Sequence, residues 1–71
     1  MESEFEIRTY GKSELAMKYY PRSSKEAAME SFRHELQLNP RLRHLISRHR
    51  HVYWPKQVRL IIEELGEPPD Y

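Results

Sequence analysis

The sequence predicts a single, mainly α-helical domain with four helices and a small two-stranded antiparallel β ribbon, arranged like a winged helix-turn-helix. Three observations lead to this fold class. Apolar residues recur at helical spacing in four segments, two short segments have strand character, and proline or glycine separates the segments. The 71 residues are enough for one hydrophobic core, so we expect one domain over residues 1–71, with 1–4 and 67–71 flexible.

The N-terminal part is predicted to form a strand and then a short helix. Phe5 and Ile7 alternate with charged residues, which is the pattern of a half-buried strand with these two side chains inward. Gly11 ends the alternation. A first helix is predicted over Lys12–Tyr20, because apolar residues recur there at helical spacing until Pro21, which cannot continue a helix.

Two more helices are predicted in the middle of the chain. Ser23 and Glu26 have the spacing of a capping box, which favours a second helix that ends near Leu38. Asn39 is followed by a proline, and this pair is typical of a helix start, since asparagine caps the first turn and proline fits its first position. The sequence therefore predicts a third helix over Pro40–Arg48.

The C-terminal part is predicted to hold the second strand and the last helix. Residues 51–54 are rich in β-branched and aromatic types and are expected to pair with the first strand. Pro55 opens a fourth helix, and Gly66 is placed to end it. The predicted core comprises Ile7, Leu15, Tyr19, Ala28, Phe32, Leu36, Leu42, Leu45, Ile46, Val52, Val58, Ile61, Ile62 and Leu65.

The composition argues against several functional classes. There is no cysteine, which excludes disulfides and thiol catalysis and favours a cytoplasmic location. No stretch approaches the roughly 18 apolar residues of a membrane span, so no membrane association is expected. No catalytic motif is present, and we expect no enzyme, cofactor or small-molecule substrate. His44, His49 and His51 lack cysteine or nearby acidic partners, so no metal site is expected.

Basic residues are concentrated in the middle of the chain. Residues 36–62 carry a charge of +6 and no acid, although the whole chain has a net charge of only +1. Such a surface can neutralise phosphates, which makes DNA the first predicted partner, for a regulatory or architectural role. On the third helix, Arg41, His44 and Arg48 would form one stripe. The predicted contacts are Arg41, Arg43, His44, Arg48, Arg50, Lys56 and Arg59.

Three further observations leave other interpretations open. Glu26 and Glu30 lie on the outer face predicted for the second helix, so that helix would be repelled from DNA. The aromatic residues, Trp54 among them, are expected to be core residues rather than to stack on bases. Met17 and Leu60 are predicted to point outward, and they favour the alternative of a protein-interaction or homodimerisation module.

Four motifs give the chain a resemblance to a known family: Ile7-Arg8-Thr9-Tyr10-Gly11-Lys12-Ser13-Glu14-Leu15-Ala16, Tyr19-Tyr20-Pro21, Pro55-Lys56-Gln57-Val58 and Leu65-Gly66-Glu67-Pro68. Together they resemble an uncharacterised family of small proteins from Bacteroides and related bacteria. The resemblance implies no activity, and the family tends to have threonine where this chain has Trp54. The predicted order of elements is also similar to small winged-helix proteins of the excisionase and MerR type, which raises the expectation of DNA binding.

Overall fold

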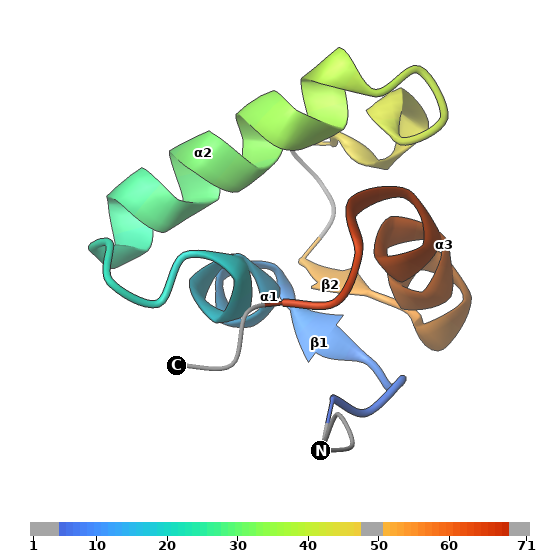
Figure 1. Ribbon diagram of the computed structural model, residues 1–71, viewed down its shortest axis with the longest axis horizontal. Helices are drawn as coiled ribbons and strands as arrows, with labels where there is room; N and C mark the ends of the chain where they lie inside the picture. Colours follow the sequence, from blue (N-terminus) through green and yellow to red (C-terminus); the bar gives the residue numbers. More distant parts are fainter. Residues whose placement is uncertain (1–4, 48–50, 69–71) are drawn as a thin grey trace.

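The computed structural model describes residues 5–47 and 51–68. The elements follow in the order β1 (Tyr10–Gly11), α1 (Lys12–Tyr19), α2 (Lys25–Leu38), a 3-10 helix η1 (Arg43–Leu45), β2 (Val52–Tyr53) and α3 (Pro55–Leu65). Helices α1 and α2 pack together, and α3 lies beside β2 (Figure 1). Among these described residues there are three α-helices, so the predicted four-helix, winged helix-turn-helix-like arrangement is wrong. None of the helices in this part of the chain has the length and apolar character to cross a membrane.

The two strands form a minimal antiparallel ribbon. Tyr10 lies opposite Tyr53, and Gly11 lies opposite Val52. A further hydrogen bond, from the Lys12 N–H to the His51 carbonyl at 3.1 Å, extends the pairing into the first residue of α1. The second predicted strand and the antiparallel ribbon are therefore confirmed, but the partner strand is Tyr10–Gly11 and not the predicted segment around Phe5 and Ile7.

The first strand lies later in the chain than predicted, because residues 5–9 fold back on Tyr10 and do not extend the ribbon. The Phe5 ring stacks on the Tyr10 ring at 5.3 Å, and the Tyr10 hydroxyl donates to the Glu6 carbonyl at 2.7 Å. The Arg8 guanidinium covers the Tyr10 ring at 3.8 Å. Ile7 is 37% exposed, so the prediction that it is buried is wrong.

Helices α1 and α2 lie close to their predicted bounds. Ser24, not Ser23, caps α2, since its hydroxyl accepts the Ala27 N–H at 3.2 Å. The predicted capping box is not formed, because the third residue after Ser24 is Ala27, which has no side-chain acceptor for the cap N–H. Helix α2 buries one face, formed by Ala28, Phe32 and Leu36, as its apolar spacing predicted.

The predicted third helix over Pro40–Arg48 is not formed in its described part, residues 40–47. The Asn39 side chain accepts the Arg41 N–H at 2.9 Å, as a helix cap would. The backbone hydrogen bonds that follow join residues three apart, because the Leu42 N–H donates to the Asn39 carbonyl and the Leu45 N–H donates to the Leu42 carbonyl. A 3-10 turn brings residues i and i+3 onto the same side. Both leucines are fully buried, so the tighter winding satisfies the core within a short connection.

Helix α3 is confirmed at both ends. Pro55 occupies the first position, and Gly66 ends the helix with φ of 83° and ψ of 170°. The preceding Trp54 has no capping side chain, and the Gln57 side-chain oxygen instead accepts the Trp54 N–H at 2.9 Å. The helix buries Val58 and Ile61.

The core contains most of the predicted residues. Tyr10, Ala16 and Tyr53 are buried and were not predicted, while Tyr19, Ile46, Val52, Ile62 and Leu65 are half-buried. At its centre, the Phe32 ring lies 5.2 Å from Tyr19 and 6.0 Å from Tyr53. The predicted residues that are fully buried are Leu15, Ala28, Phe32, Leu36, Leu42, Leu45, Val58 and Ile61.

Candidate nucleic-acid interface

Arg41 does not contribute an unbalanced charge to the predicted basic surface. Its Nη1 lies 2.9 Å from a Glu64 carboxylate oxygen, and the other Glu64 oxygen accepts a hydrogen bond from Asn39 at 3.1 Å. Glu64 belongs to α3, and its side chain is only 19% exposed. A carboxylate from another element is therefore placed next to one of the predicted DNA contacts, although the local sequence around Arg41 contains no acid.

The stripe predicted along the third helix does not exist as a helical face, because that helix is not formed. Arg43 and His44 lie on η1 and are exposed. The Arg43 Nε donates to the Gln37 carbonyl at 3.0 Å, so this side chain is directed to the end of α2. Arg48 and Arg50 lie outside the described residues.

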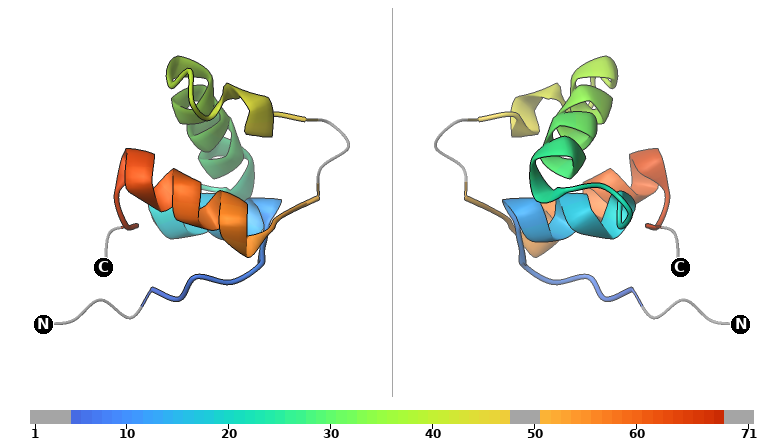
Figure 2. Two further views of the ribbon diagram at one scale, coloured as in Figure 1. Left: turned by 90° about the vertical axis from the view of Figure 1, so that its right-hand side faces the viewer. Right: turned by 90° about the vertical axis from the view of Figure 1, so that its left-hand side faces the viewer.

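Four exposed residues lie close together in the chain where β2 runs into α3. We call His51, Trp54, Lys56 and Arg59 the β2–α3 junction. All four are exposed, and they fall within nine consecutive residues. In the left view of Figure 2, η1, β2 and the first turn of α3 follow one another along one edge of the molecule.

The two cations of this junction lie on α3, where Glu63 follows Arg59 by one turn. Lys56 and Arg59 are three residues apart on α3 and so share a helix face, opposite the buried Val58 and Ile61. Within residues 5–47 and 51–68, neither of the two cations makes an ion pair. The first turn of α3 adds the partial positive charge of its free N–H groups. The junction is thus a small electropositive surface.

Trp54 differs from the other aromatic residues. Tyr10 and Tyr53 are buried, so the prediction of core positions is confirmed for these two residues. Tyr20 is half-buried, and burial raises the pKa of its hydroxyl. The prediction is wrong for Trp54, which is 58% exposed. Tyr53 is the last residue of β2, and Trp54 follows it as the residue before Pro55 opens α3, so the tryptophan lies outside the ribbon. The predicted burial of Val52 gave no signal for this exposure, because residues two apart on a strand share a face.

The two residues predicted to form a protein interface lie differently from expectation. Met17 and Leu60 are half-buried and pack against the core. The large apolar residues with the greatest exposure are instead Leu38, at 63%, and Trp54. An interface through Met17 and Leu60 stays a prediction, but the structure gives these side chains a packing role.

The histidines with described side chains lie at the surface. His44 and His51 are exposed, and His49 lies outside the described ranges. In the part of the chain that the structure describes, no three potential metal ligands lie together.

The comparison with protein families places the chain in one of them. A family model described as a domain of unknown function, DUF4248, matches residues 6–68. The match includes every helix and strand described above, and both ends of the β2–α3 junction. Neither the curated proteins nor the solved structures give a significant match. The chain therefore belongs to the DUF4248 family of domains of unknown function.

Proposed function

We propose that this protein binds DNA through the β2–α3 junction, with Lys56 and Arg59 on phosphates and Trp54 stacked on an unpaired base. The observation that carries the proposal is the exposure of Trp54, which precedes by two and by five residues two exposed cations that no described acid pairs. Proteins that hold single strands combine these same two features. A DNA-binding role also agrees with the cytoplasmic location that the absence of cysteine favours.

The proposed surface is smaller than the one predicted from charge alone. Arg41 is left out because Glu64 balances it at 2.9 Å. Helix α2 is left out because Glu26 and Glu30 are exposed on it and would face the phosphates. Arg43 and His44 are exposed on η1 and remain available for outer contacts. Each phosphate contact on a single strand adds about 0.7 to the slope of log K against log salt, and each stacked base adds roughly 1–3 kcal/mol.

Fluorescence titration tests the proposal directly, because Trp54 is the single tryptophan of the chain. Wild-type protein is titrated with a random-sequence single strand and with its duplex, at about 50 and 200 mM salt. We expect quenching of the tryptophan, tighter binding to the single strand and weaker binding at the higher salt. If neither the single strand nor the duplex binds at low salt, the proposal is refuted.

Matched variants separate a specific surface from general attraction. Lys56→Gln combined with Arg59→Gln is expected to lower the single-strand salt slope by about 1.4. The control, Lys18→Gln with Lys25→Gln, removes two exposed cations from α1 and α2 and should leave the slope close to that of wild type. Equal effects of the two double variants would contradict the assignment.

A second pair of variants tests the stacking. Trp54→Ala is expected to weaken single-strand binding by roughly 5-fold to 150-fold, which the anisotropy of labelled DNA measures. The control, Leu38→Ala, removes the other highly exposed apolar side chain and should have little effect. If both variants bind as wild type does, base stacking by Trp54 is refuted.

A further inference from the structure

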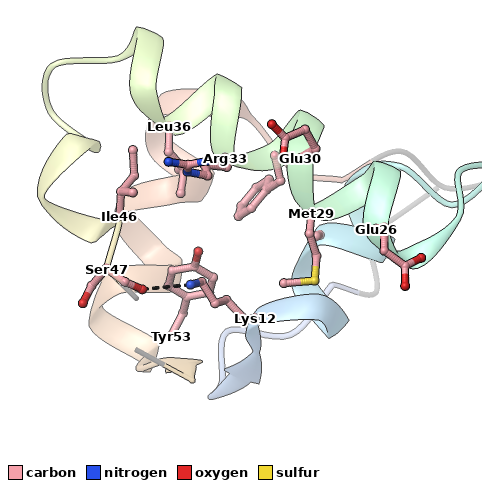
Figure 3. A pocket seen from close by; sticks show the side chains of 11 residues that line it. Lys12, Glu26, Met29, Glu30, Arg33, Leu36, Ile46, Ser47 and Tyr53 are labelled. Atoms are coloured by element: carbon pink, nitrogen blue, oxygen red, sulfur yellow. Dashed lines mark hydrogen bonds between the residues drawn. The ribbon is translucent and has the colours of Figure 1, made fainter. Parts of the chain in front are cut away.

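The core anchors the chain directly ahead of the exposed Trp54. The preceding residue, Tyr53, is buried, and its ring packs edge-on against Phe32 at 6.0 Å. The same ring lines the groove on α2, whose other walls are α1 and the residues that lead into β2 (Figure 3). Trp54 lies outside that groove. Two neighbouring residues thus have opposite surroundings, and the tryptophan is presented to solvent from a chain that is fixed one residue earlier.

Both backbone polar groups of Trp54 are hydrogen-bonded to α3. The Trp54 carbonyl accepts the Val58 N–H at 2.9 Å, which is the first backbone bond of the helix. The Trp54 N–H donates to the Gln57 Oε1, also at 2.9 Å. Any sequence that starts a helix at this position makes the first of these bonds. The second bond depends on the side chain of Gln57.

Pro55 and Gln57 restrict the tryptophan from its two sides. A residue that precedes proline is limited to extended backbone, and Trp54 has φ of −72° and ψ of 160°. An N–H at the cap of a helix has no carbonyl partner within the helix, so the Gln57 side chain satisfies a group that the helix backbone cannot. Pro55 therefore fixes the peptide after the tryptophan, and Gln57 fixes the peptide before it.

We propose that Gln57 is a positioning residue for Trp54: its side chain holds the tryptophan backbone in the one conformation that presents the indole to an unpaired base. An aromatic group that is held in place before binding loses less conformational freedom when a ligand orders it. Gln57 is half-buried in the first turn of α3 and acts through Trp54 without a contact of its own to DNA. This role rests on the proposed stacking by Trp54, whereas the hold on the tryptophan exists in the free protein.

Hydrogen exchange of the free protein, followed by NMR, tests the hold on Trp54. In Gln57→Ala, the Trp54 amide should exchange about fivefold faster than in wild type, as expected for the loss of one hydrogen bond. Gln57→Glu keeps an acceptor at this position and should restore the wild-type rate. The control, Gln37→Ala, makes the same substitution at an exposed residue of α2 and should leave the Trp54 amide unchanged. An unchanged Trp54 amide in Gln57→Ala would overturn the proposal.

A double-mutant cycle with single-stranded DNA separates positioning from a general loss of structure. Gln57→Ala is expected to weaken binding roughly threefold to tenfold in the wild-type background. The salt slope should stay unchanged, because no cation is removed. In the Trp54→Ala background, the same substitution should change binding by less than about twofold, since no indole is left to position.

The outcomes of the cycle are distinguishable. Equal losses in both backgrounds would assign Gln57 to general stability and overturn the proposal, and circular dichroism checks that all variants are folded. If wild-type protein binds no single strand, the proposed function is refuted together with this role. The exchange rate of the Trp54 amide still shows in that case whether Gln57 holds the tryptophan.

Discussion

Glu64→Ala is expected to loosen the connection between α2 and β2, because Glu64 holds two residues of that connection from α3. Its carboxylate accepts from Asn39 at 3.1 Å and pairs with Arg41 at 2.9 Å. The same connection buries Leu42 and Leu45 completely. These contacts fix the connection in the region where the predicted third helix is not formed, so their loss should lower the free energy of unfolding measurably.

The magnitude follows from the exposure of the three partners. A hydrogen bond to a charged group contributes about 1.5 kcal/mol, and most of this applies at Glu64, whose side chain is 19% exposed. The pair with Arg41, which is 68% exposed, adds only about 0.5 kcal/mol because solvent screens it. Glu64→Ala should therefore cost about 2 kcal/mol and lower Tm by about 10 °C in a domain of this size.

Urea denaturation followed by circular dichroism measures these effects, with three comparison variants. Arg41→Gln should cost about 0.5 kcal/mol. The stability loss of Glu64→Gln should lie between those of Glu64→Ala and Arg41→Gln, because its amide oxygen still accepts a hydrogen bond from Asn39. Glu63→Ala, an exposed neighbour on the same helix, controls for helix propensity. If Glu64→Ala and Glu63→Ala agree within about 0.5 kcal/mol, the connection is not held by this carboxylate.

Three further predictions concern the ends of the helices. Gly66→Ala should cost about 1–3 kcal/mol in urea denaturation, although nothing lies within 4 Å of the added Cβ, because φ of 83° with ψ of 170° strains any other residue. Burial, with a smaller effect of Glu67, raises the pKa of Tyr19, so stability should fall as pH rises above 10.0, its ordinary value. Tyr19→Phe should reduce that fall, because the raised pKa of Tyr20 leaves part of it. The variant should also lose about 1 kcal/mol at neutral pH, since the Tyr19 hydroxyl donates to the Gly66 carbonyl at 2.6 Å. The hydrogen bond from Arg8, and to a smaller extent that from the Gly11 N–H, lowers the pKa of Glu14. The contribution of Glu14 to the free energy of unfolding should therefore be present above pH 4.5 and be lost at lower pH. In Glu14→Gln, the loss of stability at acidic pH should be smaller.

The helices that the sequence predicted correctly are those with unambiguous ends. Pro21 stops α1, a serine caps α2, and Pro55 and Gly66 bound α3. The third helix failed because asparagine followed by proline starts a turn as readily as a helix. Leu42 and Leu45 would lie on one side in either structure, so the choice depends on contacts from the rest of the fold, such as those of Glu64 with Asn39 and Arg41.

The basic surface was harder to predict because charge along the chain is not charge in space. Glu64 lies 25 residues after Asn39 in sequence, yet it contacts both Asn39 and Arg41. The exposure of Trp54 was not predictable from strand alternation, because a core Val52 would place Trp54 on the same inward face. The groove on α2 was not predictable either, since its walls come from three separate segments.

The ribbon also has a consequence for the way the protein is made. Its two strands come from the first and the last third of the chain, and the Tyr53 ring packs on Phe32 in the centre of the core. On the ribosome, α1 and α2 emerge and can pack together before that ring, so the part of the Phe32 side chain that Tyr53 covers stays exposed until the last third of the chain is available. A stalled chain that ends ahead of β2 should therefore be readily cut by proteases, and release of the full-length chain should be the step that gives resistance.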